Sequence, residues 1–239
     1  VLDYRDKGYL PEALLNFLTL LGWNDGTENE IFSLEELKKS FKTRQINLSP
    51  AVFDEKKLNW MNGHYIRQKP VDELCELIEA KSSNQKAVSS FWPKEAKDAS
   101  TGYKKAVLGL VQERLKYLAE LAQLTQFFFA EPNIGSVAKL YEHPVDKQLQ
   151  KNPPDYKNLL EAVIEELSGS DFSNDDIQAR LNKLLESLGT KPAILFPVIR
   201  IAITGNTISP EIFGTLAVLG KKESLARLQK ALAYLGKQA

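Results

Sequence analysis

Cysteine, methionine and histidine are scarce in this sequence. Its 239 residues include one cysteine, one methionine and two histidines. The single cysteine, Cys75, cannot close a disulfide within the chain, and no grouping of cysteine and histidine has the spacing of metal ligands. We therefore expect a reducing, cytoplasmic setting and no metal site.

Long apolar runs and net charge are also missing. No apolar stretch approaches the roughly 18 residues that span a bilayer, and no signal peptide opens the chain, so we expect no membrane role. Acidic and basic residues number 31 each, which makes the formal net charge zero. A protein that binds nucleic acid through bulk attraction carries a basic excess. Any nucleic-acid contact must therefore come from a few placed side chains.

Motifs of catalysis are absent from the sequence as well. There is no GxSxG, HExxH or P-loop sequence, and His64 and His143 stand apart from any pattern of nucleophile and base. We identify no catalytic residue in the chain. Because the only methionine is Met61, the chain begins at Val1 without an initiator, and we expect it to be a piece of a longer protein.

What the sequence does contain is a succession of helix signals. Pro11 opens an apolar-periodic run that ends at Gly22, Ser33 and Glu36 form a capping box, and Asp54 is a candidate N-cap. No segment alternates as a strand does, and no unit of roughly 20 to 50 residues repeats. The pattern predicts an all-α protein built from packed helical bundles.

Several helix boundaries follow from these signals. We expect Asn62 and Gly63 to end the helix that follows Asp54. We also expect one long helix over residues 103–129, because apolar residues recur there at helical spacing. Later helices are predicted over the following ranges: 159–167, 173–188, 192–204, 210–219 and 223–235.

Two arginines interrupt apolar helical patterns. Arg114 falls near the middle of an apolar stripe if residues 103–129 are helical, and Arg200 is the only charge between Pro192 and Gly205. A charge that is buried without a partner is strongly destabilising. Each arginine must therefore pair with an acid, reach solvent, or project into a ligand site, and the pattern leaves these alternatives open.

The segment after Arg200 is polar and contains a helix signal. Residues 204–212 offer hydroxyl groups, and Pro210 stands at the start of a predicted helix. The first N–H groups of a helix lack partners within it, so free N–H groups at this start could bind a polar ligand. We therefore consider this segment together with Arg200.

Aromatic and basic side chains gather within residues 56–67. Trp60, His64, Tyr65 and Arg67 could stack on bases or grip phosphate, and could equally pack at an interface between domains. Lys56 and Lys57 fit a solvated helix face as well as contact with an RNA backbone. The residue types alone leave both interpretations open.

Several runs of sequence point to one family. The runs are GYLPEALLNFL at residues 8–18, LLGW at 20–23, IFSLEEL at 31–37, SPAVFDEKKLNWMNGHYIR at 49–67 and PVIRIAITG at 197–205. In this order and spacing the first four closely resemble bacterial-type glutamyl-tRNA synthetase just after its catalytic domain. The run PVIRIAITG, together with residues 216–223, resembles the end of that enzyme. Residues 80–190 match mainly in helical pattern and around Arg114.

The resemblance implies a C-terminal fragment of a class I aminoacyl-tRNA synthetase. In that family a Rossmann domain with HIGH and KMSKS motifs binds ATP and magnesium and forms glutamyl-adenylate, and neither motif occurs here. We expect a stem-contact region at residues 1–67 and helical-bundle anticodon-binding domains at 68–156 and 157–239. The full-length enzyme would attach glutamate to its tRNA, whereas this piece should be inactive and need no cofactor. The implied partners are glutamate tRNA and the missing catalytic domain, with the chain itself a monomer.

The resemblance also assigns roles to particular residues. Carried over by position, Arg114 matches the family arginine that reads the third anticodon base, and Arg200 matches another anticodon-contacting arginine. Ser209, Pro210 and Ile212 match a loop that contacts the anticodon bases, with Ser209 in place of a threonine and Ile212 in place of a leucine. Contacts to the tRNA stem are expected from a further set: Lys56, Lys57, Trp60, His64 and Arg67.

Another class of function competes with RNA binding. The helices could form a protein-interaction module in which Trp60, Tyr65 and Trp92 pack against partner proteins. They could also form an appended domain that only stabilises its catalytic neighbour.

Overall fold

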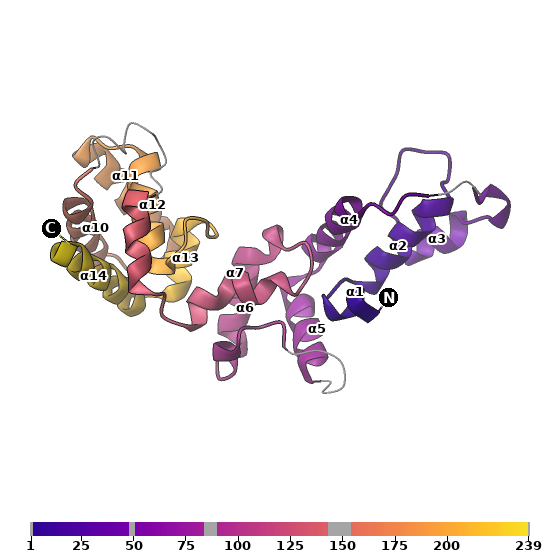
Figure 1. The fold of residues 1–239 in the computed structure, drawn as a ribbon, viewed down its shortest axis with the longest axis horizontal. Coiled ribbons are helices and arrows are strands. Elements are labelled where there is room, and N and C mark those ends of the chain that lie inside the picture. Colours follow the sequence, from indigo (N-terminus) through magenta and orange to yellow (C-terminus); the bar gives the residue numbers. More distant parts are fainter. Residues whose placement is uncertain (1, 48–50, 84–89, 143–153, 239) are drawn as a thin grey trace. The chain divides into compact units, whose positions relative to one another are not determined.

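The computed structural model describes residues 2–47, 51–83, 90–142 and 154–238. Within these ranges the regular structure is helical, and an isolated bridge between Trp23 and Ile46 joins extended backbone. The prediction of an all-α protein is confirmed. The chain forms two compact units, residues 1–125 and 126–239 (Figure 1). The finer division at residues 67 and 156 stays a prediction.

The first unit begins with short helices whose ends carry the predicted caps. Ser33 accepts a hydrogen bond from the Glu36 N–H, and the Glu36 carboxylate accepts one from the Ser33 N–H, so the capping box is confirmed. The Asp54 carboxylate likewise accepts from the N–H groups of the following turn. The helices and 3₁₀ turns up to α7 are α1 (Leu2–Asp6), α2 (Pro11–Gly22), α3 (Leu34–Ser40), η1 (Thr43–Gln45), α4 (Glu55–Gln68), α5 (Val71–Ser83), η2 (Lys94–Ala96), α6 (Thr101–Val111), η3 (Gln112–Arg114) and α7 (Glu120–Phe129).

Helix α4 runs unbroken through Asn62 and Gly63, so the predicted helix end at this pair is wrong. Asn62 is fully buried; its side chain accepts a hydrogen bond from the Leu10 N–H at 2.8 Å and donates one to the Lys116 carbonyl. A Cβ on Gly63 would lie 3.0 Å from the Leu115 carbonyl oxygen. The two residues thus allow other backbone segments to pack closely against a continuous helix.

The single helix predicted over residues 103–129 is also wrong, because the chain leaves the helical path between α6 and α7. The N–H groups of Leu118 and Ala119 donate to the carbonyls of Gly8 and Lys7 at 3.3 and 3.0 Å. The Gln112 side chain donates to the carbonyls of Ile66 and Lys69 at the end of α4. Tertiary hydrogen bonds therefore replace the helical ones that the apolar spacing predicts.

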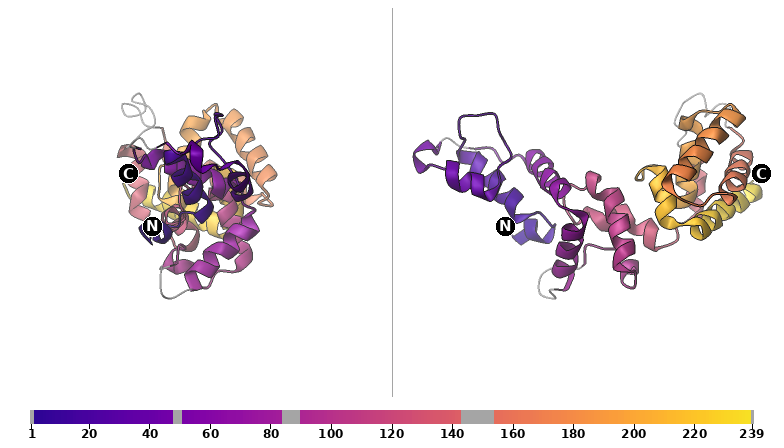
Figure 2. Two further views of the ribbon diagram at one scale, coloured as in Figure 1. Left: turned by 90° about the vertical axis from the view of Figure 1, so that its right-hand side faces the viewer. Right: turned by 180° about the vertical axis from the view of Figure 1, so that it is seen from behind.

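The second unit is a bundle in which α12 contacts α10, α13 and α14 (Figures 1 and 2). Gly189 and Gly205 follow α11 and α12 in the left-handed conformation, so these helices end at the predicted residues 188 and 204. The helices of this unit beyond α7 are η4 (Ile134–Ala138), α8 (Lys139–Glu142), α10 (Tyr156–Ser168), α11 (Asn174–Leu188), α12 (Pro192–Thr204), α13 (Ile212–Leu219) and α14 (Lys221–Gln238).

A buried arginine of the second unit bonds to the end of α12 and to the last turn of α7, whose residues from 126 on belong to this unit. Arg227 on α14 is only 4% exposed. One of its terminal nitrogens donates to the carbonyls of Phe127 and Ile203, each at 2.7 Å, and its Nε donates to Glu223. These carbonyls lie in the last turns of α7 and α12, where helical N–H partners run out. The guanidinium thus supplies a hydrogen-bond donor to carbonyls at the ends of two helices.

Candidate nucleic-acid interface

The outer face of α4 carries the aromatic and basic residues singled out in the sequence. Lys56, Trp60 and His64 recur at intervals of four residues, which places them on one side of the helix. Trp60 is 48% exposed, and its ring centroid lies 6.2 Å from that of His64. Leu58 and Met61 turn the opposite way and are fully buried. The structure therefore brings these candidates onto one accessible surface.

The two lysines of this region differ in their surroundings. Lys56 is exposed, whereas Lys57 is half-buried and forms an ion pair with Glu30. A phosphate that approached Lys57 would compete with this carboxylate. Lys56 is thus the better placed of the two for contact with an RNA backbone.

Arg114 lies on η3, which packs against α4. It is exposed at the end of the 3₁₀ turn, while Val111 and Leu115 beside it are buried. The buried-charge problem expected for Arg114 therefore does not arise, because the helix that would bury it ends at Val111. Arg67 on α4 approaches Glu113, the residue before Arg114, to 4.0 Å.

Two other aromatic residues singled out in the sequence, Tyr65 and Trp92, are buried. The Tyr65 hydroxyl lies 2.6 Å from the Asn16 side-chain oxygen and 2.7 Å from the Phe32 carbonyl, two acceptors that share its single proton, and burial raises the pKa of its phenol. Trp92 is also buried. The interaction module that would present Trp60, Tyr65 and Trp92 together is therefore wrong, since two of the three lie in the interior of the first unit.

The second candidate region lies at the end of α12. Arg200 is half-buried, and its Nε donates to the Ser209 hydroxyl at 3.0 Å. The same hydroxyl donates to the Pro210 carbonyl at 2.9 Å. Ser209, Pro210 and Ile212 are all buried, and Ser209 is bonded to the Arg200 guanidinium. Their assigned contact with anticodon bases stays a prediction.

The start of α13 is closed by a carboxylate. Glu211 is the N-cap residue, and its side chain accepts hydrogen bonds from the N–H groups of Phe213 and Gly214. The prediction of free N–H groups at this helix start is therefore wrong. An anion would meet a negative charge here in place of open donors.

Sequence reasoning missed the exposed tip of the same loop. Asn206, Thr207 and Ile208 project to solvent between buried Gly205 and buried Ser209. Ile208 is 77% exposed, the largest value among the exposed large apolar side chains of the second unit's described residues. An isoleucine inside the polar run NTISPE was the available signal.

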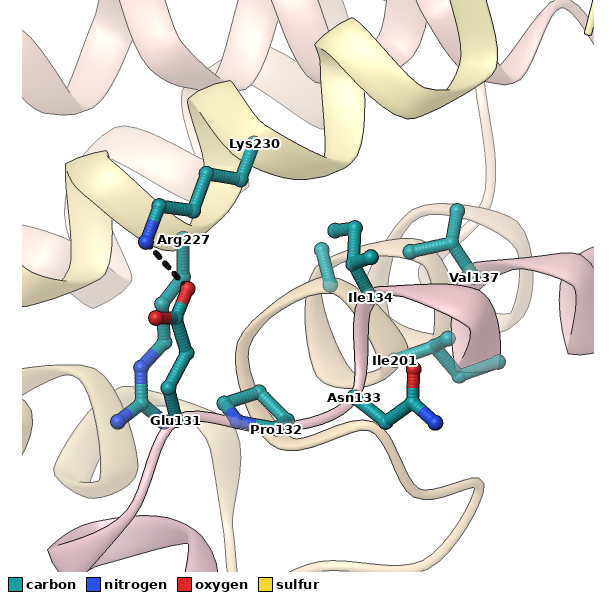
Figure 3. A pocket seen from close by; sticks show the side chains of 9 residues that line it. Glu131, Pro132, Asn133, Ile134, Val137, Ile201, Arg227 and Lys230 are labelled. Atoms are coloured by element: carbon teal, nitrogen blue, oxygen red, sulfur yellow. Dashed lines mark hydrogen bonds and ion pairs between the residues drawn. The ribbon is translucent and has the colours of Figure 1, made fainter.

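A small pocket and a wider cleft lie beside α14 in the second unit. Glu131 and Lys230, which form an ion pair, line the pocket together with Arg227 and Ile201 (Figure 3). Its volume of about 10 Å³ suits a single water molecule. The adjoining cleft of about 480 Å³ is lined in part by Tyr234 and Lys237. Glu131 and Lys230, which form the ion pair, also line this cleft.

The described ranges contain neither a group of metal-ligating side chains nor a helix that could cross a membrane. No three His, Cys, Asp or Glu residues in these ranges are grouped so that they could hold a metal ion. None of the helices in the same ranges combines the length and the apolar character that crossing a membrane requires.

Comparison with known proteins adds to this geometry. A family model described as anticodon binding domain matches residues 73–232, and one described as tRNA synthetases class I (E and Q), catalytic domain, matches residues 1–60. The chain is 35% identical to a glutamate–tRNA ligase of Geobacillus thermodenitrificans over 97% of its length. It is 36% identical to one of Clostridium botulinum over 98%. In both cases it spans 45% of the relative, so it covers less than half of these ligases.

A solved structure shares the fold. The crystal structure of a glutamate tRNA ligase from Elizabethkingia meningosepticum superposes with a TM-score of 0.76 at 23% sequence identity. The match covers 97% of this chain and 43% of that one. At this identity the likeness concerns the helical fold alone.

Proposed function

Because the chain belongs to the anticodon binding domain family and resembles the C-terminal part of glutamate–tRNA ligases, we propose that it binds glutamate tRNA and reads its anticodon. The observation that carries the proposal is Arg114. It stands exposed at the end of a hydrogen-bonded 3₁₀ turn that packs against α4. An exposed charge on a rigid support can meet a base edge without the cost of leaving the protein interior.

Recognition rests on a few side chains because the chain has no net charge. Arg114 and Arg200 donate to the edges of unpaired anticodon bases, while Ser209, Pro210 and Ile212 shape the loop around Arg200. By analogy with bidentate base readout, each good contact of this kind contributes about 1–3 kcal/mol of discrimination. The outer face of α4, with Lys56, Trp60, His64 and Arg67, contacts the tRNA stem, and Lys57 lies at its margin.

The full-length protein to which this chain corresponds is proposed to be a glutamate–tRNA ligase of class I. It would couple glutamate to tRNA with ATP and magnesium, through a catalytic domain whose HIGH and KMSKS motifs this sequence lacks. The chain itself acts as a tRNA-binding part, is inactive alone, and works as a cytoplasmic monomer. Mixed with ATP, glutamate and tRNA, it should form no aminoacylated product.

Trp60 provides a direct test of RNA contact at α4. It is the exposed member of three tryptophans, since Trp23 and Trp92 are buried. Glutamate tRNA should therefore quench Trp60 fluorescence, and Trp60→Ala should weaken binding at least about fivefold because base stacking on an aromatic ring is lost. Trp60→Phe serves as the control, because it keeps an aromatic ring and should keep most of the affinity. Equal tRNA affinity of Trp60→Ala and wild type would show that α4 does not contact the RNA.

A further inference from the structure

The loop that follows α12 is fixed at both ends. Lys139 donates to the Gly205 carbonyl at 2.8 Å, and the Asn206 N–H donates to the Thr204 hydroxyl at 3.1 Å. At the other end, Ser209 is buried and bound to Arg200. A loop that is held in this way presents its tip in a defined position.

Gly205 strengthens this attachment. It adopts a φ of +69°, and a Cβ at this position would lie 2.8 Å from the Ser136 hydroxyl and 3.0 Å from Pro132. The chain reverses here in direct contact with the segment that precedes α8. The loop therefore leaves the bundle along one path.

Ile208 stands at the tip of this fixed loop. A single exposed apolar residue is normal on a protein surface, so its 77% exposure says little alone. Its position is more informative, because the hydroxyl of the next residue, Ser209, accepts a hydrogen bond of 3.0 Å from the Arg200 Nε. An apolar side chain and a five-donor cation are thus neighbours on one surface.

We propose that Ile208 is an RNA contact that packs against the face of an unpaired base beside the one that Arg200 reads. The inference rests on the proposed function and names a residue that the resemblance does not assign. Unpaired bases expose apolar faces, and proteins that bind single-stranded RNA cover those faces while polar groups read the edges. Ile208 supplies the first kind of contact and Arg200 the second.

A contact with the face of a base predicts a different effect of substitution on RNA affinity from a contact with its edge. An isoleucine side chain forms no hydrogen bond, so it can pack on the face of any base without reading the edge of that base. Ile208→Ala should therefore weaken binding of every anticodon variant by a similar factor, about three- to tenfold on the scale of lost apolar contact. Ile208→Tyr should strengthen binding, because an aromatic ring stacks better on a base.

The test uses the 239-residue chain and the anticodon stem-loop RNA of glutamate tRNA, with binding followed by fluorescence anisotropy. Leu188→Ala is the matched control, since Leu188 is an exposed leucine of the same unit at 42%. Thermal unfolding should be unchanged in all three variants, because the replaced side chains are exposed. Loss of affinity in Ile208→Ala alone, equal across anticodon variants, supports the proposal.

Two results would overturn it. If Ile208→Ala binds every RNA as the wild type does, Ile208 is no RNA contact, although the proposed function stands. A loss confined to one base identity would show that Ile208 reads sequence, contrary to the packing role. Failure of the wild-type chain to bind the stem-loop would instead refute the proposed function itself.

Discussion

Arg227→Ala is expected to destabilise the second unit by about 3–5 kcal/mol, the range for removal of one partner from a buried charged network. The guanidinium donates to the carbonyls of Phe127 and Ile203, more weakly to that of Ala130 at 3.4 Å, and to Glu223. Alanine leaves the buried carbonyls of Phe127 and Ile203 without this donor, and an unsatisfied buried acceptor costs about 1–3 kcal/mol. The last turns of α7 and α12 should lose their connection to α14.

Hydrogen exchange at α12 and α14, together with urea unfolding followed by circular dichroism, measures this effect. Lys230→Ala is the matched control, because Lys230 lies one turn further along α14 and forms an exposed ion pair with Glu131. Such surface pairs contribute about 0–1 kcal/mol. Similar stability losses in the two variants would show that Arg227 does not connect these helices.

Gly8→Ala is expected to destabilise the first unit by about 2–4 kcal/mol, through backbone strain and overpacking together. Gly8 has a φ of +81°, which is unfavourable for any residue with a Cβ. A Cβ at this position would lie 2.5 Å from the Leu118 Cβ and 2.9 Å from the Phe91 ring. Since the Gly8 carbonyl also accepts from the Leu118 N–H, the substitution should displace the segment that follows η3.

Urea unfolding followed by tryptophan fluorescence reports on this unit, because Trp23, Trp60 and Trp92 all lie within it. Gly26→Ala separates strain from crowding. Gly26 has a similar φ of +86°, but nothing lies within 4 Å of its Cβ position. Gly26→Ala should therefore cost only about 1 kcal/mol. Equal losses at the two glycines would mean that contact with Leu118 contributes nothing.

The sequence predicts helix starts well because their signals are local. A capping side chain such as Ser33 or Asp54 bonds to N–H groups two or three residues away, so the pattern is complete within one turn. The same holds for Gly189 and Gly205, which end helices by their own backbone conformation. The all-α class follows from these signals together with apolar periodicity.

Helix interruptions depend on distant partners and could not be predicted in this way. The break between α6 and α7 forms because Leu118 and Ala119 bond to carbonyls more than a hundred residues earlier in the chain. Conversely, Asn62 and Gly63 have the sequence of a turn but lie inside an intact helix. There the Asn62 side chain bonds to the Leu10 N–H, and Gly63 lets the Leu115 carbonyl approach closely. Tertiary contacts override local propensity in both places.

The candidate site likewise combines features that the sequence predicts with features that depend on tertiary packing. Arg200 and Ser209 can be identified from the sequence through the family resemblance, but their hydrogen bond and the burial of Ser209 come only from packing. The sequence singles out Arg114 because it would interrupt an apolar stripe of a long helix. The structure removes this reason, because Arg114 lies on an exposed turn. Ile208 becomes a candidate only when its exposure is known.

The most direct test of anticodon reading changes Arg114 and the third anticodon base together. Stem-loop RNAs with the natural and with a substituted third base are titrated against the wild-type chain and against Arg114→Ala. The wild type should bind the substituted RNA about 5- to 150-fold more weakly, the equivalent of about 1–3 kcal/mol, whereas Arg114→Ala should bind both RNAs equally. If Arg114→Ala still distinguishes the two RNAs as strongly as the wild type, Arg114 does not read the anticodon.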